Sequence, residues 1–265
     1  MNLHSNDSND SQFHDFIDSQ LIYDLLYIIT KKIHTDDLFH LSNCTVSLNS
    51  MIHHPIFLKN KLYSIRSMKR YINRKQWNDA LWDAAEHGEF EICKYFVSLG
   101  ATNFNIALTY AACHGHLELC KYFVSLGATH LNIALSNAAN YGHLELCKYF
   151  VSIGATDLNG ALWITARSGH LHICKYFVSL GATNFNSALW ITARNGHLHI
   201  CKYLISQGAT DFDYALENAT IYGYLHICKY LVSIGATNFN TALELAVQYG
   251  HLHICKYLES ISTDK

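Results

Sequence analysis

One pattern of apolar and polar positions recurs every 27 residues from residue 77 to residue 265. One copy, from Gly115 to Thr129, reads Gly-His-Leu-Glu-Leu-Cys-Lys-Tyr-Phe-Val-Ser-Leu-Gly-Ala-Thr. Its cysteine belongs to a column of seven: Cys93, Cys120, Cys147, Cys174, Cys201, Cys228 and Cys255. A fixed period of this length indicates stacked copies of one small unit, not a globule with a central site. The pattern therefore favours an extended recognition surface over catalysis.

Each unit is expected to form two short helices. The first helix is expected to start at a residue whose side chain caps free amide donors. These residues are Asn78, Asn105, Asn132, Asn159, Asn186, Asp213 and Asn240. Glycine, which enters the left-handed conformation without steric penalty, is expected to end both helices. The first set is Gly88, Gly115, Gly142, Gly169, Gly196, Gly223 and Gly250, and the second is Gly100, Gly127, Gly154, Gly181, Gly208 and Gly235. The seventh copy lacks the second glycine, so the stack is expected to end there.

The second helix of each unit has one apolar face. In the copy at 115–129 the apolar positions i, i+3, i+6 and i+7 are Leu117, Cys120, Phe123 and Val124. The polar positions of the same copy are Glu118, Lys121 and Ser125. This spacing predicts an amphipathic helix that buries the first set and exposes the second.

The order of a small pair, Gly-His-Leu-Glu-Leu/Ile-Cys-Lys-Tyr-Leu and Gly-Ala resembles the ankyrin repeat. An ankyrin repeat has about 33 residues, with a β-hairpin finger between units; here only a triplet such as Thr-Asn-Phe follows Gly-Ala. The resemblance implies an all-α, ankyrin-like α-solenoid of seven helix-turn-helix repeats without finger hairpins at 77–265. This shortened form is similar to ankyrin proteins of large DNA viruses. Without fingers, the first helices are expected to supply most of the contact surface.

The cysteine column invites a disulfide or metal interpretation, which the geometry disfavours. Neighbouring helices lie ~8–10 Å apart, whereas a disulfide needs Cα atoms about 4.4–6.8 Å apart and zinc needs sulfur at about 2.3 Å. Equivalent cysteines of successive units are therefore too far apart for either. We expect small buried hydrophobic residues in a reducing compartment, with no metal and no cofactor. Cys44 and Cys113 lie outside the column.

Two columns of histidine follow the same period. The first comprises His116, His143, His170, His197 and His251. It is expected to bond to neighbouring turns. The second comprises His172, His199, His226 and His253, which replace the glutamate of the earlier copies. It is expected to be exposed, and the outer face becomes more basic along the chain; a solvated face and an acidic or nucleic-acid partner are the alternatives. Two histidines at i and i+2 point to different sides of a helix, which disfavours a metal site.

The fourth and fifth units differ from the others in the first helix. Only there does the sequence combine tryptophan, isoleucine and arginine: Trp163, Ile164, Arg167, Trp190, Ile191 and Arg194. At the tryptophan position other units carry Thr109, Ser136, Glu217 and Glu244. Tryptophan and arginine are enriched in binding hot spots, so these six residues are the candidate partner-binding site. The alternative is that both tryptophans pack between units.

The N-terminal part does not share the period. Residues 1–12 are rich in Asn, Asp and Ser and are expected to be a disordered lead. Residues 13–76 are expected to form a small helical module whose leucine spacing is similar to an F-box, which docks onto the Skp1 adaptor of ubiquitin ligases. By that resemblance the adaptor contact would be formed by Leu21, Leu25, Ile29, Leu38 and Leu41. The alternative is a helical cap on the first repeat. Basic residues between Lys59 and Lys75 suit a solvated helix, nuclear import or phosphate contact.

Composition narrows the function further. The net charge of −2 gives no signal for nucleic acid or membrane, and no run of 18 apolar residues predicts a membrane helix. The sequence lacks a glycine-rich phosphate loop and a Gly-x-Ser-x-Gly motif. We therefore expect a non-catalytic protein-protein interaction protein in the cytoplasm or nucleus, in the host cell if it is viral. One hypothesis is an adaptor that recruits host proteins to a Skp1-type ubiquitin ligase; the other is a structural scaffold.

Overall fold

The computed structural model describes residues 76–262. Throughout this range the only regular secondary structure is α-helix, and no strand occurs in it. The chain divides into two compact units, Met1–Ala80 and Leu81–Lys265. The predicted lead at 1–12 and the predicted module at 13–76 lie outside the described residues, apart from Gln76.

The helices of the described range form seven pairs, as the 27-residue period predicts. The first helices are α4 (Trp77–Glu86), α6 (Phe104–Cys113), α8 (Leu131–Asn140), α10 (Leu158–Ser168), α12 (Phe185–Arg194), α14 (Phe212–Ile221) and α16 (Phe239–Gln248). The second helices are α5 (Phe90–Ser98), α7 (Leu117–Ser125), α9 (Leu144–Ser152), α11 (Leu171–Ser179), α13 (Leu198–Ser206), α15 (Leu225–Ser233) and α17 (Leu252–Ser262). The prediction of an all-α solenoid without finger hairpins is confirmed for these residues.

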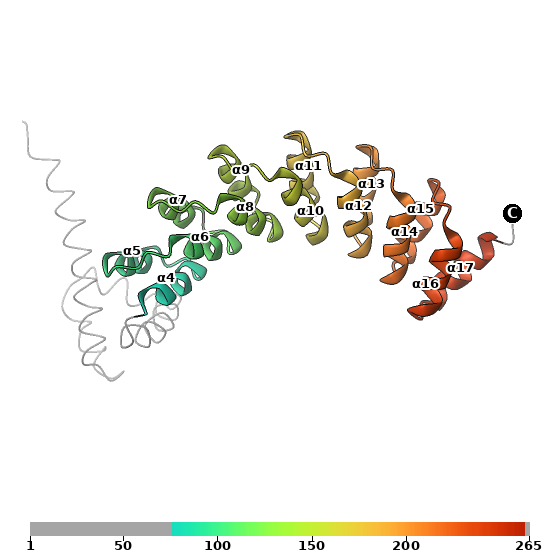
Figure 1. Cartoon of the computed structure of the whole chain (residues 1–265), viewed down its shortest axis with the longest axis horizontal. Helices are drawn as coiled ribbons and strands as arrows, with labels where there is room; N and C mark the ends of the chain where they lie inside the picture. Colours follow the sequence, from blue (N-terminus) through green and yellow to red (C-terminus); the bar gives the residue numbers. More distant parts are fainter. Residues whose placement is uncertain (1–75, 263–265) are drawn as a thin grey trace, which may run out of the picture. The chain divides into compact units, whose positions relative to one another are not determined.

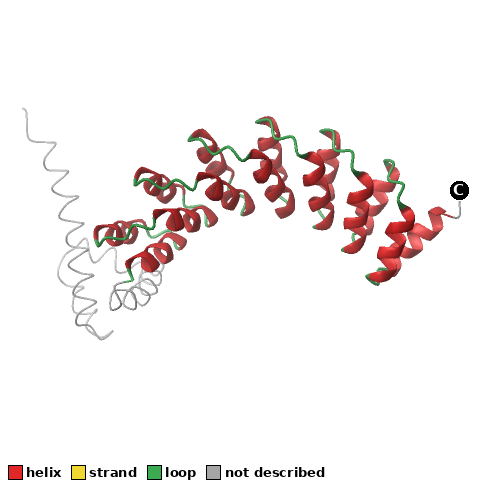
Figure 2. Cartoon of the chain, viewed as in Figure 1, coloured by secondary structure: helices red, strands yellow, loops and turns green. Residues whose placement is uncertain are grey.

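Within the unit Leu81–Lys265 the pairs stack side by side in a curved row (Figures 1 and 2). First helices pack closely on one another, as in α10, α12 and α14, whereas successive second helices make far fewer contacts. The first helices accordingly lie on the inner, concave side of the row and the second helices on the outer side (Figure 1). The first helices, which are expected to supply most of the contact surface, therefore form the concave side.

The core between the two helices of a pair differs at three positions from the sequence expectation. In α7 the fully buried residues are Leu119, Cys120 and Phe123, while Leu117 and Val124 are only half-buried. Leucine stands at both 117 and 119, so periodicity alone could not choose between two faces about 160° apart. The packing against α6 selects the face centred on Cys120.

Both sets of glycine end their helices as predicted, since all thirteen have a positive φ. After α7 the N–H of Ala128 donates to Phe123 O at 3.0 Å, and the N–H of Gly127 donates to Val124 O at 3.0 Å. These two bonds satisfy carbonyls that the helix end leaves free, in a Schellman arrangement. A left-handed residue at this point turns the chain directly into the short loop before the next pair.

The column of Asn and Asp residues that was expected to start the first helices does not cap them, which corrects the sequence expectation. Helix α6 begins at Phe104, so Asn105 already lies in the first turn. Its Oδ1 accepts the backbone N–H groups of Thr129 and His130 in the next repeat, at 2.7 and 3.0 Å. The same pair of bonds, at 2.6–3.2 Å, is made by Asn132, Asn159, Asn186 and Asp213. These five members of the column therefore tie the second to sixth repeats to the loops of their successors.

Substituting Asn159 tests this tie between repeats. Asn159→Ala is expected to lower the free energy of unfolding by about 1–2 kcal/mol, because two backbone N–H groups of residues 183 and 184 lose their acceptor. Asn159→Asp is the matched control and is expected to change stability by less than about 0.5 kcal/mol, since Asp213 makes the same bonds in its repeat. Urea unfolding of the full chain at pH 7 measures both, and an unchanged Asn159→Ala protein would contradict the tie.

The aspartate at position 213 adds a pH dependence with a definite sign. Burial would raise the pKa of Asp213, but N–H groups of Asn238 and Thr237 bond to the carboxylate and leave its pKa below the usual range. A depressed folded-state pKa gives stability that is present above the unfolded-state value of about 4 and lost as pH falls through the folded-state value. Asn159→Asp is therefore expected to make the protein more sensitive to acid below about pH 4 than the wild type.

Candidate interaction face

Three aromatic side chains form a continuous strip across the first helices of the fourth, fifth and sixth repeats. The rings of Trp163 in α10 and Trp190 in α12 meet edge-to-face, with centroids 6.2 Å apart and planes at 62°. Trp190 meets Tyr214 in α14 in the same way, at 5.9 Å and 63°. Both indoles are half-buried and Tyr214 is 47% exposed. These three residues are called the aromatic strip below.

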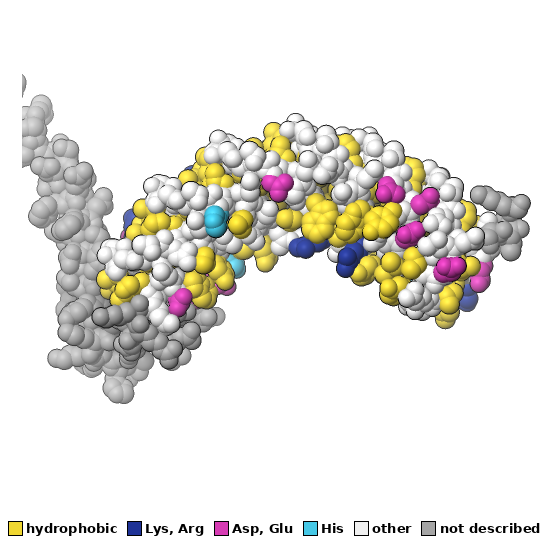
Figure 3. All heavy atoms as spheres, viewed as in Figure 1, with side chains coloured by type: hydrophobic (Ala, Val, Ile, Leu, Met, Phe, Trp, Pro, Cys, Tyr) yellow, Lys and Arg dark blue, Asp and Glu magenta, His cyan; other side chains and the backbone are white. Residues whose placement is uncertain are grey.

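The local sequence explains why the tryptophans face outward. In α10 the pairs Ala161-Leu162 and Thr165-Ala166 are fully buried, at positions i, i+1, i+4 and i+5 of one helix face. Trp163 follows the first pair and falls at the edge of that face, so its ring lies between the core and the concave surface. Figure 3 shows hydrophobic side chains gathered on the visible face in the middle of the row, with basic side chains directly below them towards the concave edge.

An arginine follows each tryptophan of the aromatic strip by one helical turn. The guanidinium of Arg167 lies 5.5 Å from the Trp163 ring and donates to Asn140 Oδ1 at 3.1 Å. The guanidinium of Arg194 lies 4.8 Å from the Tyr222 ring. Both arginines are exposed, and neither takes part in an ion pair within residues 76–262. Cation–π contacts hold the side chains in place while their charges stay available.

The structure removes some residues from the predicted partner-binding site and adds others. Ile191 is only 3% exposed and belongs to the core, because it faces the packing side of α12, and Ile164 is half-buried. Of the predicted residues, the structure brings Trp163, Trp190, Arg167 and Arg194 together at the surface. Tyr214 and Tyr222, which were not predicted, also belong to this surface. Tyr214 follows Trp190 by 24 residues, so a comparison at the 27-residue period could not detect the contact.

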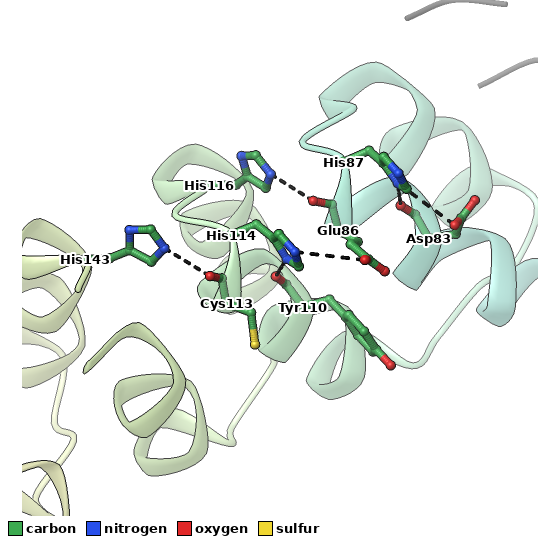
Figure 4. Close-up of polar contacts among 8 residues, drawn as sticks. All are labelled: Asp83, Glu86, His87, Tyr110, Cys113, His114, His116 and His143. Carbon is green, nitrogen blue, oxygen red and sulfur yellow. Dashed lines mark hydrogen bonds and ion pairs between the residues drawn. The ribbon is translucent and has the colours of Figure 1, made fainter. Parts of the chain in front are cut away.

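The first histidine column is confirmed as a link between repeats. His116 Nε2–H donates to Glu86 O at 3.0 Å and His143 Nε2–H to Cys113 O at 3.0 Å (Figure 4). The corresponding bonds of His170, His197 and His251 are 2.9–3.1 Å long. Each ring thus bonds to a carbonyl at the C-terminal end of the first helix of the preceding repeat, which the helix itself leaves without a donor. The second column is exposed, also as expected.

Figure 4 also shows a polar group on the first helices of the first two repeats. His87 bonds to Asp83 O at 2.8 Å, and His114 bonds to Tyr110 O at 3.0 Å with Glu86 Oε1 3.9 Å from its Nε2. These contacts satisfy helix carbonyls and form weak surface pairs. Between residues 76 and 262 no three His, Cys, Asp or Glu side chains are placed to hold a metal ion.

The column cysteines are buried free thiols. Burial raises the pKa of Cys120, Cys147 and Cys201 to about 12 and the pKa of Cys174 and Cys228 to about 11. At neutral pH these thiols are therefore protonated and poor nucleophiles. They serve as small apolar residues in the core, as the sequence predicts, and Cys113 is only half-buried.

None of the helices between residues 76 and 262 has the length and apolar character that crossing a membrane requires.

Comparison with known families agrees with this geometry. The family model for ankyrin repeats, which spans three copies, matches residues 135–215 and residues 189–264. No curated protein matches the chain. The alternation of first and second helices also holds before residue 135, where α6 packs on α8 as the later first helices pack on one another. Residues 135–264 therefore match ankyrin repeats, which are modules of protein–protein interaction, and the described residues form an α-solenoid of that type.

Proposed function

We propose that this protein is a non-catalytic interaction protein that binds a partner protein on the concave face of α10, α12 and α14. The observation that carries the proposal is the aromatic strip, in which three partly exposed rings contact one another beside two arginines that form no ion pair within residues 76–262. Tryptophan, tyrosine and arginine dominate binding hot spots because they combine large apolar area with a polar group.

The variation among repeats supports this location. Core positions such as the Ala-Leu pair and the cysteine column are occupied by the same residues in nearly every repeat, because every repeat packs in the same way. The position of Trp163 and Trp190 also carries tryptophan in the first repeat, at Trp82, but it carries threonine, serine or glutamate in the other four repeats. The fold therefore does not require tryptophan there, and recognition of a partner is a sufficient reason for it.

Footprinting of side chains tests the proposed face. The partner is first isolated with the full chain as bait and then purified. Hydroxyl radicals oxidise accessible aromatic side chains, so a bound partner is expected to protect Trp163, Trp190 and Tyr214. The exposed Tyr141 and Tyr249 (56% and 50%) serve as internal controls on other repeats. Protection of the outer helices alone, with unchanged oxidation of the strip, would contradict the proposal.

A finer function concerns the N-terminal part, whose residues lie outside the described range. We propose that residues 13–76 dock onto a Skp1-type adaptor, so that the protein recruits host proteins to a ubiquitin ligase in a virus-infected cell. The leucine spacing at Leu21, Leu25, Ile29, Leu38 and Leu41 supports this. Leu25→Asp combined with Ile29→Asp is expected to abolish co-purification of Skp1 and leave the repeats folded, and absence of Skp1 from the intact chain would refute the role.

The second candidate function is a structural scaffold in which the N-terminal part only covers the first repeat. The general need of solenoids for a polar terminal cap favours it. In either case we place the protein in a reducing compartment, the cytoplasm or the nucleus, since seven buried thiols remain unpaired. Binding of a partner to the strip that persists after deletion of residues 1–75 would fit both the adaptor and the scaffold. Binding of Skp1 fits only the adaptor.

A further inference from the structure

The outer surface of the solenoid changes in character halfway along the stack. In α5, α7 and α9 the exposed lysine of each second helix forms an ion pair with the glutamate three residues before it. The Nζ–Oε1 distances are 3.1 Å for Lys94–Glu91, 2.7 Å for Lys121–Glu118 and 2.8 Å for Lys148–Glu145. The outer face of the first three repeats is therefore electrically balanced.

In the next three repeats histidine replaces this glutamate, so the lysine of each second helix no longer has a carboxylate partner three residues before it. Each ammonium group lies instead over the tyrosine ring of the following repeat. The Nζ–centroid distances are 5.7 Å for Lys175–Tyr203, 5.2 Å for Lys202–Tyr230 and 5.5 Å for Lys229–Tyr257. All three lysines are exposed, and α11, α13 and α15 contain no acidic residue.

We propose that Lys175, Lys202 and Lys229, named the lysine row, form a docking surface for an acidic polypeptide segment. The row lies on the outer helices and is independent of the aromatic strip on the first helices. The tyrosine rings fix the three ammonium groups in one line across the repeats, which reduces the entropy that a partner must remove on binding. Charge complementarity then selects a partner with regularly spaced carboxylates.

The spacing of the row suits a chain in the polyproline II conformation. Adjacent helices lie ~8–10 Å apart, and a polyproline II chain has about three residues per turn and rises about 3.1 Å per residue. Carboxylates at every third residue therefore lie on one side of the chain, about 9 Å apart, and can meet successive lysines. A segment of about seven residues with acidic side chains at positions 1, 4 and 7 spans the row.

A polypeptide fits the row better than a nucleic acid does. Duplex DNA presents one charge per ~1.7 Å, whereas the row offers one per ~10 Å. Proteins that bind single strands stack bases on aromatic faces, but here lysine covers a face of Tyr203, Tyr230 and Tyr257. No arginine, the usual partner of phosphate and bases, occurs in α11, α13 or α15.

The chain itself supplies the test variants. His172→Glu, His199→Glu and His226→Glu together copy the glutamate of the first three repeats, so each lysine of the row regains an ion-pair partner. Glu91→His, Glu118→His and Glu145→His together copy the later repeats and free three further lysines. Both exchanges place residues that the equivalent helices of other repeats already carry. Circular dichroism of each variant checks that the full chain remains helical.

The probe is a fluorescein-labelled 13-residue peptide with glutamate at every third position, and its counterpart carries glutamine instead. Fluorescence anisotropy at about 10 mM salt, where the Debye length is about 30 Å, measures binding to the full chain. The triple glutamate variant is expected to bind the acidic peptide on the order of tenfold more weakly than wild type, and the triple histidine variant more tightly by a similar factor.

Two results overturn the proposal. One is equal binding of the acidic peptide by wild type and the triple glutamate variant, because any binding would then arise elsewhere, for example at the basic residues between Lys59 and Lys75. The other is that wild type binds a 13-nucleotide oligothymidylate more tightly than the acidic peptide, and that the triple glutamate variant loses this binding too. That result would make the row a nucleic-acid surface. Binding at the aromatic strip is unaffected by either result, because the row lies on other helices.

Discussion

Alanine at Gly142 is expected to lower the free energy of unfolding by about 2–3 kcal/mol. Gly142 has a φ of +84°, a left-handed conformation that costs a residue with a Cβ about 1–2 kcal/mol. The added Cβ would also lie 2.8 Å from Cε1 of His170. The imidazole must then move and weaken its bond to Asn140 O, a loss of about 1 kcal/mol.

Two variants separate the steric part of this effect from the backbone part. Gly154→Ala also places alanine at a positive φ, +106°, but nothing lies within 4 Å of its added Cβ. The decisive comparison is Gly142→Ala in a His170→Ala background, measured by urea unfolding. Removal of the ring is expected to recover about 1 kcal/mol, and a coupling energy near zero would show that the histidine ring does not depend on the glycine.

Loss of the tryptophans is expected to have the largest effect on partner binding. Trp163→Ser and Trp190→Ser should each weaken the affinity for the partner about thirtyfold, or about 2 kcal/mol, as truncation of a hot-spot residue does. Serine is chosen because Ser136 holds the equivalent position of α8. Each indole is half-buried, so the accompanying loss of stability should be modest, about 1–2 kcal/mol.

Calorimetric titration of the purified partner against the full-length variants measures this effect. Tyr249→Ser is the matched control, since it removes an aromatic side chain that is 50% exposed on a distant repeat, and it should leave the affinity within about twofold. A steep fall in thermal stability with unchanged affinity of the folded fraction would assign both tryptophans to inter-repeat packing alone. The edge-to-face contact at 6.2 Å also predicts that the two substitutions are not additive.

Local features of the repeat could be predicted from sequence because they depend on contacts within one helix pair. The glycines at both helix ends and the burial of the cysteine column follow from the steric needs of short helices and turns, which are the same in every copy. The choice of Leu119 over Leu117 for the core could not be predicted, since both are leucine and only the direction of the neighbouring helix distinguishes them.

The sequence by itself determined the number, length and polarity of the helix pairs, because every unit packs in the same way and therefore repeats the same apolar and polar positions every 27 residues. The tertiary structure decided what joins one unit to the next: Asn105 with a loop 24 residues later, His116 with a carbonyl 30 residues earlier, and Trp190 with Tyr214. These offsets depend on how far one pair is displaced along its neighbour. Equivalent positions do not meet one another in these contacts, so the surfaces for partners appear only once the repeats are stacked.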